Sequence, residues 1–320
     1  MIVGAGALGQ SFAALLAASG QPVSLLATPR SAERLHRAGF IALRGVVELD
    51  IPVADVNVTA QVADLPRDAI ALFTTKGHDL PAAIREIAEI QPAWAAGVQN
   101  GIVKDDLLVA AFGQQRVVGA ATIFGGVRQN DGSVRVASRG MTYFGELDGR
   151  TSERTAAVVE HFVTAGIPAQ ARTDIASVLW SKACNATGVF GICVLARASN
   201  AQLFSDPDLM RAYLTLVRET AAVAAAYGVR VGNYPGFPPI RDYAEGDEQT
   251  LLAGLAPRRV EQEPGYASMT HDLMAGNPME VDSIFGDIVE RAQRRGVAVP
   301  CLQFTRDVLR GLNRERMNGA

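Results

Sequence analysis

The chain opens on a glycine-rich turn, Gly4-Ala5-Gly6-Ala7-Leu8-Gly9, which strongly restricts how its first residues can fold. Residues Met1–Val3 are apolar and predict the end of a strand, and Gln10–Ser19 predict a helix. In a strand–turn–helix unit of this kind the first glycine permits the tight turn. The second lets the backbone approach a pyrophosphate, and the third lets the helix pack close to the sheet. The free N–H groups of the helix would then hold the phosphates, so the turn predicts a dinucleotide site. A first strand of three residues also suggests that the natural chain begins a few residues earlier.

The second predicted strand, Pro22–Ala27, lacks the acidic residue expected after it. Chains that bind NAD carry Asp or Glu about 20 residues past the glycines, where the carboxylate grips the ribose 2′-hydroxyl. Here Thr28-Pro29-Arg30 occupies that place. The guanidinium of Arg30 suits a 2′-phosphate, and the Thr28 hydroxyl adds a donor. The sequence therefore favours NADP over NAD, although Arg30 could also be a solvated loop charge.

Composition excludes several classes of function. The formal net charge of −3 gives no electrostatic footprint for nucleic acid or an anionic membrane. The three cysteines and four histidines show no metal-binding spacing, so we expect no metal. We find no leader sequence and no apolar run long enough for a membrane span, and free thiols suit a reducing compartment. These observations predict a cytoplasmic protein.

Strands and helices alternate through the first half of the chain, which predicts an α/β fold with a doubly wound, Rossmann-type sheet. Beyond it, two segments predict antiparallel strands joined by a polar turn, namely Gly132–Ala137 and Met141–Gly145. The other elements expected in this half are strands at Ala69–Thr75, Ala95–Gln99 and Arg116–Ile123 and helices at Pro81–Glu89 and Ser152–Ala165.

From Asp174 onward the pattern is helical. A length of 320 residues favours two domains. We predict a nucleotide-binding domain over residues 1–170 and an all-helical substrate and catalytic domain over residues 171–320, with the active site between them. The helices expected there are Ile175–Ala196, Pro207–Tyr227, Asp282–Arg295 and Gln303–Asn313.

Polar residues follow two of the strands, where ligands bind in open α/β sheets. Lys76 can reach a cofactor phosphate or ribose, and Asn100 can bond the substrate or the nicotinamide side. Either could instead cap a loop, which is the usual role of Asn before Gly. Lys182, in an apolar helical stretch, either extends to solvent or is placed in a cleft.

With these residues the chain resembles the ketopantoate reductase (2-dehydropantoate 2-reductase) family over nearly its whole length. The resemblance is carried by the glycine turn, Lys76, Asn100-Gly101, the Trp180-Ser181-Lys182 motif, Ser268, Glu280-Val281-Asp282 with Gly286, and Gly296-Val297-Ala298-Val299-Pro300. It implies hydride transfer from NADPH to the carbonyl of a 2-keto acid, most simply ketopantoate.

The resemblance also implies roles for individual residues. Lys182 would be the general acid that protonates the developing alkoxide, and Glu280 would orient hydroxyl groups beside it. Ser268 would hold the substrate carboxylate, and Asn100 would help to place Lys182 and the nicotinamide. Gly125 would contact the cofactor through its backbone, and Asn200 would contact the substrate.

Two departures from the family pattern keep other readings open. Positions four and eight residues after Lys182, where the family often has Asn, hold Ala186 and Phe190, and the family arginine after the second strand is Thr28. A reductase of another 2-keto acid is therefore an alternative, as are a β-hydroxyacid dehydrogenase relative and an NADPH sensor without turnover. Apolar segments such as Leu251–Leu255 would suit either a homodimer interface or the core.

Overall fold

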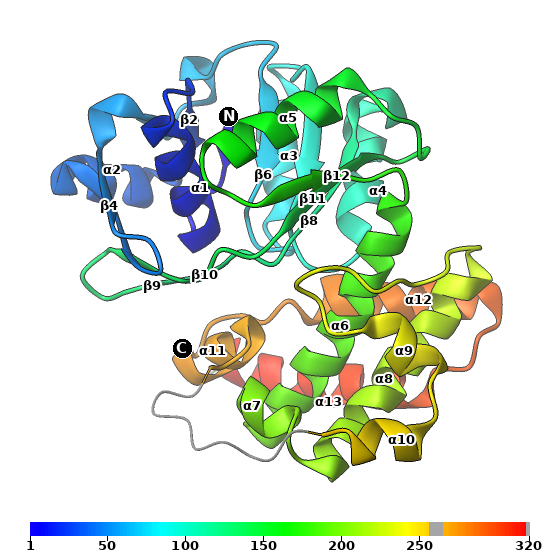
Figure 1. Ribbon diagram of the computed structural model, residues 1–320. Helices are drawn as coiled ribbons and strands as arrows, with labels where there is room; N and C mark the ends of the chain where they lie inside the picture. The colour runs from blue at the N-terminus through cyan, green and yellow to red at the C-terminus, as the bar shows by residue number, and fades with distance from the viewer. Residues whose placement is uncertain (256–264, 318–320) are drawn as a thin grey trace. The chain divides into compact units, whose positions relative to one another are not determined.

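The computed structural model describes residues 1–255 and 265–317, which form two compact units (Figure 1). The first unit comprises Met1–Gln99 and Lys104–Ala176. The second comprises Asn100–Val103 and the chain from Ser177 onward. The long helix α6 (Ile175–Ala196) begins in the first unit and continues through the second.

A five-stranded parallel sheet forms the centre of the first unit, with the strand order β5-β2-β1-β6-β7. Each strand is two to four residues long, and β1, β6 and β7 are wholly apolar, as expected for strands buried on both faces, whereas the edge strand β5 contains Asn57 and Thr59. This order places β1 and the glycine turn in the middle of the sheet and confirms the doubly wound Rossmann-type prediction. The strands are β1 (Ile2–Val3), β2 (Ser24–Leu26), β5 (Asn57–Thr59), β6 (Ile70–Phe73) and β7 (Trp94–Gly97).

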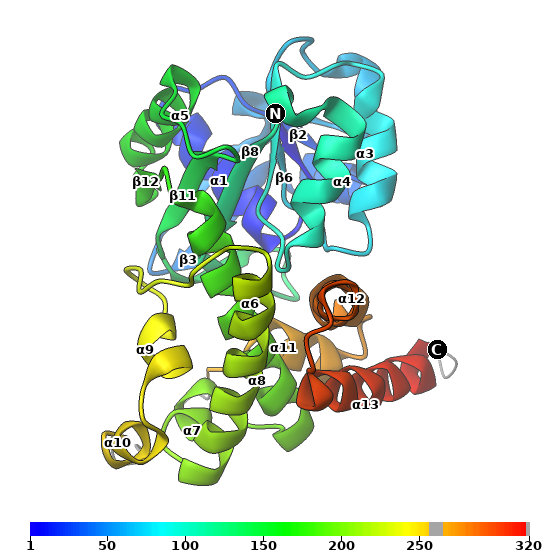
Figure 2. The same ribbon diagram turned by 90° about the vertical axis from the view of Figure 1, so that its right-hand side faces the viewer.

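Helices cover both faces of the sheet because successive side chains of a strand point in opposite directions. Ile2 packs in the apolar cluster that contains α1 (Ala7–Ala18), whereas Val3 packs in the cluster of α3 (Leu80–Ala88) and α4 (Val103–Phe112). The same alternation separates Leu25 from Leu26. Figure 2 shows α3 and α4 side by side on one face of the sheet. A further helix, α2 (Pro29–Ala38), follows β2.

The predicted pairing of Gly132–Ala137 with Met141–Gly145 is wrong. The first segment forms β10 (Val134–Ser138), which pairs antiparallel with β9 (Gly125–Arg128) and parallel with β3 (Phe40–Gly45). The second forms β11 (Thr142–Glu146), which belongs to another sheet between β8 and β12. The hairpin turn is Gln129–Gly132, where Gly132 has φ +90° and donates its N–H to the Gln129 carbonyl at 3.1 Å. Strand β9 was not predicted, because its Gly125-Gly126 start weakens the strand signal.

The remaining elements of the first unit are strands of the two smaller sheets, one helix and short 3₁₀ turns. Residue Val117, just before β8, makes a parallel bridge to Ala95, so this part of the chain continues the central sheet. The elements are β4 (Leu49–Pro52), β8 (Val118–Thr122), β12 (Ala169–Ala171), α5 (Glu153–Thr164) and short 3₁₀ turns η1 (Val53–Asp55), η2 (Val62–Asp64) and η3 (Gln114–Arg116).

Every regular element described in the second unit is helical, as predicted. Asp206 caps α8 (Pro207–Ala226) through its carboxylate, and Gly228 follows the helix with φ +75°. Residues Asp282–Gly286 form a π-helix, η4, where a continuous α-helix was expected. The other helices are α7 (Asn200–Leu203), α9 (Ile240–Glu245), α10 (Glu248–Ala253), α11 (Ser268–Ala275), α12 (Asp287–Arg295) and α13 (Pro300–Met317).

Helix α6 is long and apolar enough to span a bilayer, so the prediction that no segment has that length is wrong. Its most apolar stretch has a mean hydropathy of 1.4, and 83% of that stretch is buried inside the structure. A core helix of a globular protein has the same properties. The apolar surface of α6 is therefore covered by the protein's own packing.

Candidate functional site

The three glycines of the first turn differ in what surrounds them. Gly4 has φ +109°, and a side chain there would meet Thr75 at 2.8 Å. A Cβ on Gly9 would lie 1.9 Å from the Gly4 carbonyl oxygen. Gly6, by contrast, has no heavy atom within 4 Å of the position that a Cβ would take. Gly4 and Gly9 are thus required by the fold, whereas the space beside Gly6 is open to a ligand.

The turn leads directly into α1, which begins at Ala7 with Gly6 as its N-cap. The helix starts three residues earlier than predicted, so Ala7, Leu8 and Gly9 all lie in its first turn. The N–H groups of a first turn have no partners within the helix and attract anions. Two hydrogen bonds hold the turn: Gln10 donates to the Ala5 carbonyl at 2.7 Å, and Thr74 donates to the Gly4 carbonyl at 2.8 Å.

Thr28 and Arg30 lie at the start of α2, not in a loop. The Thr28 hydroxyl oxygen caps this helix by accepting from the Ser31 N–H at 3.3 Å, and Pro29 is its first residue. Arg30 is exposed in the first turn. A second helix N-terminus therefore follows β2 and carries a guanidinium group, which suits a phosphate.

Lys76 and Gly125 complete the predicted cofactor residues of the first unit. Lys76 is half-buried three residues after the end of β6. Gly125 is the first residue of β9, where an added Cβ would lie 3.1 Å from the Ser138 hydroxyl oxygen. Both residues follow strands, at the positions where side chains and backbone can face a ligand.

Lys182 is a half-buried residue of α6 in the second unit. Its neighbour Ser181 is fully buried and accepts from the Gly232 N–H at 2.9 Å while donating to the Ser177 carbonyl at 2.7 Å. The bond from Gly232 attaches this turn of α6 to the loop after α8. The ammonium group is thus carried by a fixed turn of the helix.

Glu280 is 4% exposed and lies just before the π-helix η4. Its carbonyl accepts from the Ser283 hydroxyl at 3.2 Å and from the Ile284 N–H at 3.3 Å. Single π-turns within helices occur frequently at functional sites. Here the wider turn begins two residues after the buried Glu280.

Asn100 and Gly101 follow β7 and pack against the same π-turn. Gly101 has φ +90°, and a Cβ at this position would lie 2.3 Å from the Ser283 carbonyl oxygen. Because Ser283 is three residues past Glu280, this contact brings the Asn100 segment beside the Glu280 segment. These residues are far apart in the sequence, and all of them belong to the second unit.

Ser268 and Asn200 are both exposed at the starts of helices. Ser268 is the first residue of α11, and Asn200 is the first residue of α7, which has a capping box at Ser199. The Asn200 N–H donates to the Gly265 carbonyl at 2.9 Å, three residues before Ser268. The two segments therefore lie side by side.

Two positions of α6 where the family often has Asn hold Ala186 and Phe190 in this chain. Ala186 and Phe190 are buried, at 4% and 8% exposure, and neither offers a hydrogen bond to a polar group. Asn185, one position from Ala186, accepts through its side-chain oxygen from the Tyr213 hydroxyl at 3.0 Å, so its side chain is directed to α8. The face of α6 that continues from Lys182 is therefore apolar.

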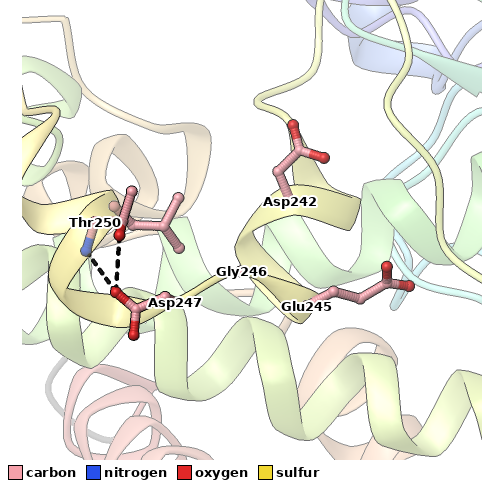
Figure 3. Close-up of a pocket in the computed structure, with 6 residues that line it drawn as sticks. Asp242, Glu245, Gly246, Asp247 and Thr250 are labelled. Atoms are coloured by element: carbon pink, nitrogen blue, oxygen red, sulfur yellow. Dashed lines mark hydrogen bonds between the residues drawn. The ribbon is translucent and has the colours of Figure 1, made fainter.

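An acidic pocket of about 370 Å³ lies elsewhere in the second unit, around α9 and α10 (Figure 3). Asp247 caps α10 by accepting from the N–H and hydroxyl of Thr250. The Arg230 guanidinium pairs with Glu245 and lowers the pKa of that carboxyl. The residues that line this pocket include none of the predicted site residues, and their carboxylates would repel the carboxylate of a keto acid. This pocket is not a candidate active site.

Within residues 1–255 and 265–317, no group of three or more His, Cys, Asp or Glu side chains is placed to hold a metal ion. Cys184 and Cys193 are buried, and burial raises the pKa of the Cys193 thiol to about 12. Neither thiol is suited to act as a nucleophile.

Family models match both parts of the chain. The model for "Ketopantoate reductase PanE/ApbA" covers residues 1–149, and the model for its C-terminal domain covers residues 174–313. The chain belongs to the ketopantoate reductase family. It is accordingly an oxidoreductase that acts on CH–OH groups with a nicotinamide cofactor, and the family reaction is the reduction of a keto acid.

Two kinds of relative agree with this assignment. The 2-dehydropantoate 2-reductase of Archaeoglobus fulgidus is 28% identical over 312 residues, covering 97% of this chain and 96% of the relative. Among solved structures, a family member from Ralstonia eutropha is 23% identical with a TM-score of 0.80, covering 99% and 100% of the two chains. A D-mandelate dehydrogenase is 19% identical with a TM-score of 0.82, and it covers 99% of each chain. At these identities the structural matches establish the fold alone.

Proposed function

We propose that this reductase uses NADPH to reduce a 2-keto acid, with ketopantoate as the first candidate substrate. The observation that carries the proposal is the arrangement of the second unit, where the Asn100–Gly101 segment packs against the π-turn after the buried Glu280. The same unit contains Lys182, Ser268 and Asn200.

The first unit fits the cofactor in two places. The open space beside Gly6 and the start of α1 suit a pyrophosphate, for which Gly4–Gly9 would provide N–H donors. Thr28 and Arg30 suit a 2′-phosphate, because a helix N-terminus and a guanidinium both favour an anion. The rest of the cofactor would be contacted by Lys76, Asn100, Gly125 and Glu280. When bound, the nicotinamide supplies the hydride.

The remaining chemistry belongs to protein side chains. The ammonium group of Lys182 would stabilise the negative charge that develops on the carbonyl oxygen, and its Nζ would then deliver a proton to that oxygen. Glu280 would orient the hydroxyl groups beside Lys182. Ser268 and Asn200, at adjacent helix starts, would hold the substrate carboxylate and its neighbouring polar groups.

Substrate choice has one specific alternative. Ala186 and Phe190 offer no hydrogen bond to a substrate hydroxyl, so a 2-keto acid with an apolar side chain is the second candidate. A structural relative is a D-mandelate dehydrogenase complexed with anilino(oxo)acetate, which carries an aromatic group.

Assembly and location are further proposals. A Staphylococcus aureus ketopantoate reductase of similar fold is described as dimeric, and we propose that this protein also forms a homodimer. A cytoplasmic location remains a prediction from the sequence.

The proposal is tested with purified protein, by following loss of NADPH absorbance with ketopantoate and a panel of other 2-keto acids. Lys182→Met keeps a long helix-forming side chain but removes the proton donor. We expect kcat to fall by about 1,000-fold or more while the Kd for NADPH stays unchanged. Full activity in Lys182→Met would contradict the assigned role. Tight NADPH binding by the wild-type protein without turnover of any keto acid would favour a sensor.

A further inference from the structure

Two aromatic rings and one arginine form a stack behind the part of α6 that carries Lys182, and a second arginine lies beside the stack on the Tyr227 ring. The buried Trp180 ring lies 6.0 Å from the Tyr227 ring, centroid to centroid, at an interplanar angle of 31°. The Arg291 guanidinium carbon lies 6.0 Å from the Trp180 centroid and 5.7 Å from the Tyr227 centroid. Arg295 lies 4.5 Å from the Tyr227 centroid. Three helices of the second unit, α6, α8 and α12, therefore meet at this stack.

Arg291 is held in place by a buried ion pair. Its Nε donates to Oδ2 of Asp287 at 2.8 Å, and the two side chains are only 9% and 7% exposed. Removing both charges from water is costly, and an apolar pair of similar volume is often as stable or more stable. Stability alone therefore gives no reason for charges here. A fixed hydrogen-bond geometry does, because the carboxylate determines where the guanidinium lies against the Trp180 ring.

The stack connects the two predicted catalytic residues through rigid elements. Trp180 is two residues before Lys182, so a helical step of about 100° per residue puts the two side chains on nearly opposite sides of α6. Asp287 and Arg291 are on α12, which continues the π-turn that follows Glu280. The stack thus joins the rear of the Lys182 helix to the segment that carries Glu280.

A small shift of the Trp180 ring would rotate α6 and displace the Lys182 ammonium group. A side-chain tip about 5 to 6 Å from the helix axis moves about 1 Å when the helix rotates by about 10°. Displacing a catalytic group by about 1 Å can reduce the rate on the order of 100-fold. The ammonium position is therefore sensitive to how Trp180 is seated.

We propose that Asp287 and Arg291 are positioning residues of this reductase, which act through Trp180 to set Lys182 relative to Glu280. The inference rests on the proposed function, since it takes Lys182 as the proton donor. The Asp287–Arg291 pair was not predicted from the sequence. The only signal was a carboxylate and an arginine four residues apart in the helix after Glu280, a spacing that is common on exposed helix surfaces.

The test compares an apolar replacement of the pair with a matched control. Asp287→Leu combined with Arg291→Met removes the buried charges and replaces them with apolar side chains. Arg295→Met removes the neighbouring exposed arginine from the same tyrosine but leaves the Trp180 contact intact. We expect the double variant to lose about 10- to 100-fold in kcat, with KM and the Kd for NADPH close to wild type. Its Tm should stay within a few degrees, and the control should match wild type in every measurement.

Two single variants keep the test decisive if the double variant does not fold. Asp287→Asn keeps the shape but weakens the hold on Arg291, and Arg291→Lys keeps the charge but loses the planar stacking group. Both should lower kcat more than they lower Tm or alter KM. If kcat is unchanged in these variants while the separate variant Lys182→Met is inactive, the inference is overturned and the proposed function still stands. A wild-type protein that reduces no 2-keto acid would overturn both.

Discussion

Two glycines of the same turn should respond in opposite ways to the addition of one methyl group. In Gly9→Ala the new Cβ would lie 1.9 Å from the Gly4 carbonyl oxygen, about 1.5 Å closer than the 3.4 Å of ordinary contact. The atom that must move is backbone, so the turn itself is displaced. Overpacking of this kind costs about 1–3 kcal/mol, which exceeds the helix-propensity gain of about 0.5–1 kcal/mol.

In Gly6→Ala the new methyl group meets nothing within 4 Å. The free energy of unfolding should change by less than about 1 kcal/mol, because Ala is only a poorer N-cap than Gly. The methyl group would instead stand where the backbone approaches the pyrophosphate. Losing one charge-assisted hydrogen bond costs about 1.5–3 kcal/mol, which lowers NADPH affinity by about 10- to 100-fold.

Thermal unfolding without cofactor and NADPH titration of each variant separate these two effects. We expect Gly9→Ala to lower Tm by about 4–8 °C, taking about 2 kcal/mol for a unit of this size. Gly6→Ala should leave Tm nearly unchanged and weaken binding. A Gly9→Ala protein as stable as wild type would refute the packing argument, and a Gly6→Ala protein that binds NADPH normally would refute the pyrophosphate assignment.

Three further predictions concern other parts of the molecule. In fluorescence titrations, Arg30→Ala should weaken NADPH binding about 10-fold or more and leave NADH binding unchanged. The control is Arg37→Ala, which should affect the binding of neither cofactor. Arg37 lies on the same helix and pairs with Glu33 at 2.6 Å. In Glu146→Gln we expect a lower free energy of unfolding at neutral pH. Hydrogen bonds from Arg154 and then Ser152 lower the pKa of the Glu146 carboxyl below its usual 4.5. This stabilisation is present above about pH 4.5 and is lost as pH falls through the folded-state pKa, so the difference from wild type in denaturant titrations should vanish in acid. Gly101→Ala should lower kcat, because its Cβ would press on the Ser283 carbonyl beside Glu280; equal kcat values in steady-state assays would contradict this.

Local signals were sufficient wherever one short segment fixes the outcome. The cap at Asp206-Pro207 and the stop at Gly228 marked the ends of α8 correctly, because each depends on the conformation of its own residues. Four of the five strands of the parallel sheet were likewise predicted from short apolar runs, whereas β5, with the sequence Asn-Val-Thr, was not. The β10 pairing was wrong because strand partners are chosen across the fold, and the same apolar pattern suits a neighbour on either side.

The sequence by itself determined the Rossmann-type sheet and the helical second half, since short apolar strands, the glycine turn and helical periodicity are properties of short segments. It also determined membership of the reductase family, through motifs such as Trp180-Ser181-Lys182 and Glu280-Val281-Asp282. Only the tertiary structure decided that Gly6 faces open space while Gly9 is packed against backbone. It also decided that Asn100–Gly101 lies against the turn after Glu280 and that Asp287 fixes Arg291 on Trp180. The reason is physical: the contacts of Gly101 with Ser283 and of Arg291 with Trp180 join residues far apart in the chain, and even the local contacts depend on backbone positions that the whole fold fixes.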